Sequence, residues 1–169
     1  MPTVLKTVER DERSVGSNPT ASSTLQQLLE DKFSVFPEDI KFVFEDCLLV
    51  GGAIVSLLRN EDINDFDICL SQEHAILLRR YYKDINDIIL ILPGNIHITY
   101  FTKEEFIEKK YVPTFVHSAV YYDFKEKCLY VTKEQLECIQ SKTLKIINPS
   151  YRQAYLDKFI DRGWKVHDQ

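Results

Sequence analysis

At 169 residues, the chain has the length of one domain and can bury a continuous core. Its 26 acidic and 21 basic residues give a net charge of −5, which excludes nucleic-acid binding through bulk positive charge and leaves a local patch for such a contact. No apolar run approaches the length of a membrane span, and no N-terminal segment reads as a signal peptide. Four cysteines without a Cys-x-x-Cys pair predict free, buried thiols in a reducing compartment, so we expect a cytoplasmic protein without a membrane partner.

The N-terminal residues differ in composition from the rest of the chain. Residues 1–23 mix charges with a run of Gly, Ser, Asn, Pro and Thr and show no sustained apolar period, so we expect a disordered tail. The domain is then expected over 24–169.

The apolar periodicity and the turn residues of that domain predict strands that alternate with helices. In the first half of the domain, the expected elements are a helix capped by Ser23 or Thr24, a short helical or turn segment from Pro37, a strand over 47–50, a helix over 53–59, a strand over 66–70 and a helix capped by Ser71. In the second half, we expect strands over 88–92 and 96–101, a helix capped by Thr102, a hairpin of 114–122 with 128–131 and a helix capped by Thr132. A last helix, with Tyr155, Phe159 and Ile160 inward, is expected to end at Gly163. This order predicts an α/β (α+β) domain with a mixed sheet flanked by helices.

The segment 48–70, LLVGGAIVSLLRNEDINDFDICL, carries the most chemical information. A buried strand delivers Gly51 and Gly52 to the start of a helix. Glycines at such a turn let the backbone approach a phosphate closely, and the free N–H groups of the first helical turn favour an anion. We therefore expect a phosphate-binding turn here.

An acidic pair follows this turn. Side chains alternate along a strand, so Asp65 and Asp67 are expected on one side and Phe66 on the other. Two carboxylates one strand step apart can share Mg²⁺, which prefers hard oxygen ligands and completes its shell with substrate phosphates. The two halves of the segment complement each other, because one receives phosphate and the other receives the metal.

The segment resembles the head of the nucleotidyltransferase superfamily, which includes DNA polymerase beta, poly(A) polymerases and CCA-adding enzymes. CCA-adding relatives typically read GGAVRDLLLG…KDIDI, and this chain reads GGAIVSLLRN…NDFDI. The resemblance is strong over about 23 residues and extends further only as an order of elements. A compact head of this kind also resembles stand-alone phage nucleotidyltransferases.

The resemblance implies transfer of a nucleoside monophosphate from an NTP to a hydroxyl, with pyrophosphate leaving. It assigns Gly51, Gly52 and Ser56 to nucleotide binding, and Asp65 and Asp67 to catalysis and to Mg²⁺ or Mn²⁺. The acceptor stays open among an RNA 3′ end such as that of tRNA, a small molecule and a protein hydroxyl.

The chain departs from the family pattern at two places. Val55-Ser56 replaces the Arg-Asp pair that follows the glycines. A third carboxylate is expected on a later strand, and the best positional match, Ile96-His97-Ile98, puts His97 there. Imidazole can ligand a metal or act as a base at neutral pH, but adds no negative charge, so His97 is included among the candidate catalytic residues.

Other candidates rank lower. His117 is expected in a strand, where it could face the cleft, and Tyr100 could stack on a base. Lys158 and Arg162 are expected to be solvated charges on the last helix.

These departures leave a second hypothesis, a non-catalytic module that keeps the fold and its nucleotide affinity. A third is an unrelated α/β protein in which Gly-Gly and Asp-x-Asp coincide by chance. Carboxylates that point into a cleft beside the glycine turn would exclude the third.

Overall fold

The computed structural model describes residues 19–82 and 90–167. The expected tail before residue 19 and the start of the strand expected over 88–92 lie outside these ranges. The helices are α1 (Pro19–Phe33), α2 (Glu38–Lys41), α3 (Gly52–Leu58), α4 (Gln72–Tyr81), α5 (Lys103–Ile107), α6 (Lys133–Ser141) and α7 (Gln153–Asp161), with 3-10 turns η1 (Phe42–Phe44) and η2 (Val116–Ala119). The strands are β1 (Leu48–Val50), β2 (Phe66–Cys69), β3 (Leu90–Leu92), β4 (Ile96–Ile98), β5 (Tyr121–Asp123), β6 (Cys128–Tyr130), β7 (Thr143–Leu144) and β8 (Lys165–Val166).

Six of the strands form one mixed sheet in the order β3-β4-β2-β1-β5-β6, and β7 pairs with β8 separately. Within the large sheet, β2 and β4 run parallel, while the other neighbouring strands are antiparallel. The strands β1 and β2 occupy the middle, which explains their largely apolar sequences. The expected α/β domain with a mixed sheet flanked by helices is confirmed.

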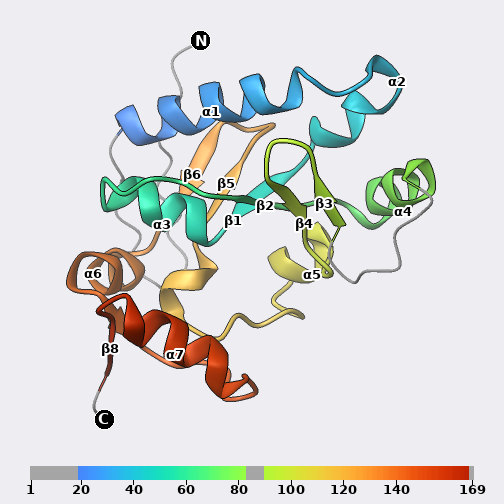
Figure 1. Ribbon diagram of the computed structural model, residues 1–169. Coiled ribbons are helices and arrows are strands. Elements are labelled where there is room, and N and C mark those ends of the chain that lie inside the picture. Colours follow the sequence, from blue (N-terminus) through green and yellow to red (C-terminus); the bar gives the residue numbers. More distant parts are fainter. Residues whose placement is uncertain (1–18, 83–89, 168–169) are drawn as a thin grey trace.

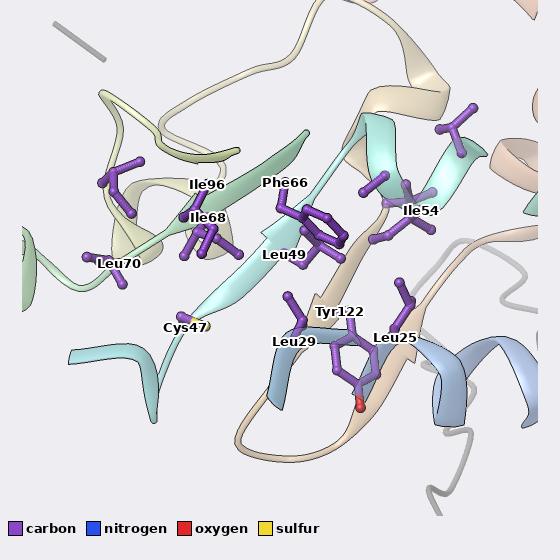
Figure 2. Packing of buried hydrophobic residues seen from close by; sticks show 14 of the residues in the cluster. Leu25, Leu29, Cys47, Leu49, Ile54, Phe66, Ile68, Leu70, Ile96 and Tyr122 are labelled. Atoms are coloured by element: carbon purple, nitrogen blue, oxygen red, sulfur yellow. The ribbon is translucent and has the colours of Figure 1, made fainter. Parts of the chain in front are cut away.

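Much of the main core lies on one face of this sheet, against α1 and α3, and the same cluster continues to Ile139 of α6 and Leu156 of α7. Leu49, Phe66 and Tyr122 project from three neighbouring strands toward Leu25 and Leu29 of α1 (Figure 2). Figure 1 shows α1 along this side of the sheet and α5, α6 and α7 on the opposite side. The opposite face carries a smaller apolar cluster and, beside it, the polar residues described below.

The expected helix start was wrong, because α1 begins at Pro19 rather than at Ser23 or Thr24. Residues 19–23 are therefore helical rather than a tail. Proline is well tolerated in the first helical turn, and Ser22 is completely buried. Tertiary packing has overridden the modest helix propensity of the Ser and Thr residues.

The segment expected as a long strand over 114–122 is also different. Strand β5 begins only at Tyr121, and Val116–Ala119 forms the turn η2. Phe115 instead makes an isolated bridge with Ile146, and Val116 N–H donates to the carbonyl of Lys145. Pairing with the segment before α7 has replaced pairing along the sheet.

Several smaller expectations are settled by the structure. The capping boxes at Thr102 and Thr132 and the side-chain cap at Ser71 are confirmed, as are the four free, buried cysteines. In α7 the buried residue is Leu156, and Tyr155 and Ile160, which were both expected inward, are exposed. Among the described residues, no helix combines the length and the apolar character needed to span a bilayer.

Candidate functional site

The glycine turn lies between β1 and α3. Gly51 has a φ of 67°, which L-residues with a side chain rarely adopt, and its N–H donates to Val120 O at 3.3 Å. Its carbonyl accepts from the N–H groups of Ile54 and Val55. The first turn of α3 is thereby held against η2, while a Cβ at Gly52 would meet no atom within 4 Å. The backbone at Gly52 is open to a ligand.

The two glycines give a matched pair of substitutions. Gly51→Ala forces a side chain into the left-handed region and is expected to lower the free energy of unfolding by about 1–2 kcal/mol. Gly52→Ala occupies an ordinary helical position, so its stability should be unchanged or slightly higher, while its added methyl group reduces affinity for any phosphate seated there. Chemical denaturation measures the first effect and nucleotide titration the second. Equal stability of the two variants would contradict the strain assigned to Gly51.

The acidic pair lies beside this turn. Phe66 and Ile68 are buried in the main core, so Asp67 projects from the opposite face of β2. Asp65, just before the strand, and Asp67 both line a cleft of about 660 Å³. The six residues assigned to catalysis, metal or nucleotide from the sequence all line this cleft: Gly51, Gly52, Ser56, Asp65, Asp67 and His97. The two acids therefore line the same cleft as the glycine turn.

His97 is the direct neighbour of Asp67 across the parallel pair β2–β4. Its Nδ1 lies 3.7 Å from Asp67 Oδ1, and the two side chains are 27% and 41% exposed, respectively. Burial and the nearby charge of Asp65 raise the pKa of Asp67 to about 6, against the lowering influence of His97 and Lys158. Two like charges that line the same partly desolvated cleft favour a bound cation.

The donor set suits a metal whose shell the substrate completes. Among the described residues, no three His, Cys, Asp or Glu side chains are grouped so that they could hold a metal ion. Mg²⁺ usually keeps several waters and binds through one or two carboxylates plus substrate phosphates. Asp65 and Asp67, both facing the cleft, fit that mode, whereas a closed structural zinc site would need four protein ligands.

The wall opposite the acids comes from the C-terminal part of the chain. Tyr155, Lys158, Phe159 and Arg162, at the spacing i, i+3, i+4, i+7, present one face of α7 and its C-cap to the cleft. Lys142 lines the same wall, and its Nζ donates to Arg162 O at 2.8 Å. The expectation that Lys158 and Arg162 were merely solvated charges was incomplete, because their helical spacing from Tyr155 already indicated one shared face.

Comparisons with known proteins bear on the fold. No protein-family model matches the chain, and no curated protein matches it in sequence. A CCA-adding enzyme solved in an apo form matches 86% of this chain and 43% of its own chain, at a TM-score of 0.52 and 14% identity. The Thermotoga maritima CCA-adding enzyme solved with tRNA matches 82% of this chain and 42% of its own, at 0.53 and 15%. A CCA-adding enzyme solved with ATP matches 90% and 40%, at 0.50 and 17%.

The chain has the nucleotidyltransferase fold. It spans less than half the length of these solved structures. Within this nucleotidyltransferase fold, His97 is paired in register with Asp67, at the position where the sequence suggested a third carboxylate. The resemblance seen over the Gly-Gly and Asp-x-Asp segment thus extends to the architecture of the domain.

The cleft also contains His117, which sequence reasoning placed below His97. His117 lies in η2 rather than in a strand, lines the cleft and is 2% exposed. Its ring stacks on Trp164 at 4.4 Å and on Phe115 at 5.4 Å between centroids. Its Nδ1 is buried without a hydrogen-bond partner among the described residues, and burial lowers the pKa of His117 to about 4. The imidazole is therefore neutral at physiological pH.

Tyr100 lines the same cleft and is 59% exposed. Its ring meets Phe101 and Tyr111 edge-on. Its remaining surface is free for contact with a planar ligand.

Proposed function

We propose that the chain transfers a nucleoside monophosphate from an NTP to a hydroxyl acceptor, with Mg²⁺ or Mn²⁺ held by Asp65 and Asp67, and that the acceptor is an RNA 3′ end such as that of tRNA. One observation carries this proposal. A single cleft brings the acidic pair, an open glycine turn and the cations of α7 together, which is the charge arrangement that a metal-bound triphosphate requires.

In this proposal, residues from two opposite walls of the cleft contact the triphosphate. Gly52 offers backbone that a phosphate can approach, and Ser56, one turn further along α3, faces the same cleft. Lys158 and Arg162 neutralise phosphate charge from the opposite wall, where guanidinium binds phosphate oxygens in pairs. His117 and Trp164 form an aromatic surface beside these cations.

The reaction conserves its atoms and charges as follows. The acceptor oxygen forms a bond to the α-phosphorus, the bond between that phosphorus and the bridging oxygen breaks, and pyrophosphate leaves with the electron pair. A bound divalent cation would stabilise charge on the phosphates and on the attacking oxygen. In this proposal His97, beside Asp67, accepts the proton of the acceptor hydroxyl.

The test combines a binding signal with an activity. Trp164 is the single tryptophan of the chain and lines the cleft, so its fluorescence should change when an NTP binds with Mg²⁺. Incubation with labelled NTPs, Mg²⁺ or Mn²⁺ and total RNA should then transfer label to RNA. A fluorescence change without label transfer to any acceptor would contradict the enzymatic proposal.

The α7 cations make a separate prediction. Replacing Lys158 and Arg162 together with alanine removes two charge-assisted contacts and is expected to weaken NTP binding by about 10- to 100-fold. Arg152→Ala, which removes an exposed charge at the start of the same helix outside the cleft, is the matched control. Titration followed by Trp164 fluorescence measures both, and unchanged affinity of the double variant would refute the assignment of this wall to phosphate.

A second candidate function is a nucleotide-binding module without transferase activity. It is favoured by the imidazole of His97 beside Asp67, because imidazole supplies no negative charge to a metal, unlike a carboxylate. His97→Gln separates the two: it removes the proposed proton acceptor and lowers the transfer rate of an active enzyme, whereas neither the natural protein nor the variant transfers label if the chain only binds nucleotide.

A further inference from the structure

A second cavity lies next to the cleft on the same face of the sheet. It has a volume of about 300 Å³, and its lining includes the aromatic rings of Phe106, Tyr111, Tyr121 and Tyr130 with the small side chain of Ala119. We call it the aromatic pocket. Phe106 and Tyr111 line both the pocket and the cleft, so the two spaces are adjacent.

The sheet fixes the position of the aromatic pocket relative to the acids. Asp67 pairs in register with Val50, Val50 with Tyr121, and Tyr121 with Tyr130. These residues form one row, and register partners point to the same face. With strands about 4.8 Å apart, Tyr121 lies about 10 Å and Tyr130 about 14 Å from Asp67 along the row. A molecule that places a hydroxyl at Asp67 can therefore reach the pocket with the group next along its chain.

The rings that form the pocket pack against one another and against Phe101. Tyr121 and Tyr130 stack with ring centroids 4.6 Å apart and planes at 12°. Phe106 and Tyr121 pack edge-to-face, with ring centroids 5.5 Å apart. Tyr111 stacks on Phe101 at 3.6 Å. A flat apolar ligand would meet preformed surfaces without a cost for ordering them.

One cation stands at the rim. Lys109 lines the pocket, is exposed, and has no ion pair within the part of the chain that the structure describes. Its neighbours are already paired, Lys110 with Glu108 and Lys145 with Glu134. Lys109 is therefore available to an anionic ligand group at the mouth of the pocket.

We propose that the aromatic pocket binds a nucleobase near the 3′ end of a single-stranded RNA acceptor, with Lys109 at an adjacent phosphate. This inference rests on the proposed function and specifies its acceptor. Sites for single-stranded nucleic acid combine aromatic platforms with cations that follow the backbone, and the pocket shows both within reach of the acidic pair. Its volume is at the lower end of small-ligand sites, which suits one base.

The test measures RNA binding without any NTP. Fluorescence anisotropy measures the binding of two 5′-labelled single-stranded RNAs of about ten nucleotides. They are identical except that in one of them the last two nucleotides carry no base. The natural protein is expected to bind the intact RNA about tenfold more tightly. Ala119→Leu fills the pocket and should abolish this difference, while Ala154→Leu, the same change at an exposed site of α7 outside the pocket, should preserve it. Lys109→Ala should reduce the salt dependence of binding by about one counterion.

The outcomes separate the pocket from the catalytic proposal. If the Ala119→Leu variant keeps the change in Trp164 fluorescence on NTP binding, its cleft is intact. A loss of base discrimination in that variant is then due to filling of the aromatic pocket. Should Ala119→Leu fail to fold, Val112→Phe narrows the pocket from an exposed position and replaces it. Base discrimination that survives filling, or its absence in the natural protein, overturns the inference even if NTP transfer is observed. Discrimination without NTP binding upholds the pocket and contradicts the proposed function.

Discussion

Asp67→Asn is expected to lower the rate of nucleotide transfer by about 10³-fold, which corresponds to about 4 kcal/mol of transition-state stabilisation. The substitution keeps the size of the side chain and removes one of the two charges that we propose hold the metal. It also relieves repulsion by Asp65, so the fold should be as stable as before or slightly more stable. The measurement is single-turnover transfer of labelled NTP at saturating Mg²⁺.

The matched control is Asp62→Asn, which makes the same change at an exposed position of the loop before β2, outside the cleft. It should transfer at the rate of the natural protein. Full activity of Asp67→Asn would refute the role given to this carboxylate, even if the predictions on NTP and RNA binding were confirmed.

His117 is expected to make the stability of the protein fall by about 3 kcal/mol as the pH is lowered from 6.5 to 4. Its pKa is 6.5 in the unfolded chain and about 4 in the fold. The unfolded state therefore takes up a proton first as the pH falls, and unfolding is favoured. The contribution of His117 is complete above pH 6.5 and lost as the pH approaches 4.

The measurement is the free energy of unfolding by denaturant at several pH values, for the natural protein and for His117→Phe. Phenylalanine keeps a ring between Phe115 and Trp164 but has no proton to bind. Asp67 has a raised pKa and acts in the opposite direction, but it is common to both proteins and cancels in the difference. Parallel pH profiles would show that the ring of His117 is not desolvated as described.

The part of the site that could be predicted is the part encoded by adjacent residues. Gly51 and Gly52 end an apolar strand, and Asp65 and Asp67 begin another, so local alternation was enough to place the acids on one face. The position of His97 followed from its apolar neighbours Ile96 and Ile98, which pair with residues of β2 and β3.

The remainder depends on contacts between distant segments. Lys158 and Arg162 reach the cleft because α7 packs against η2, where Phe115 and His117 meet Phe159. The spacing from Tyr155 places Lys158 and Arg162 on one helical face, but such a face has the same sequence whether it meets solvent or a ligand. The start of α1 was missed for a related reason, since Ser22 is buried by tertiary packing that its own polarity does not indicate.

The opposing charges of the cleft come from segments far apart in the chain. The acids and glycines lie between residues 51 and 67, whereas Lys142, Lys158 and Arg162 follow the sixth strand of the large sheet, and the C-terminal segment is joined back through Lys165 N–H to Lys142 O at 2.9 Å. During synthesis on the ribosome, the negative half emerges first and exists for a time without its counterpart. A polyphosphate that contacts both groups of charges would link α7 to the sheet. A bound nucleotide would therefore slow local unfolding of this last helix.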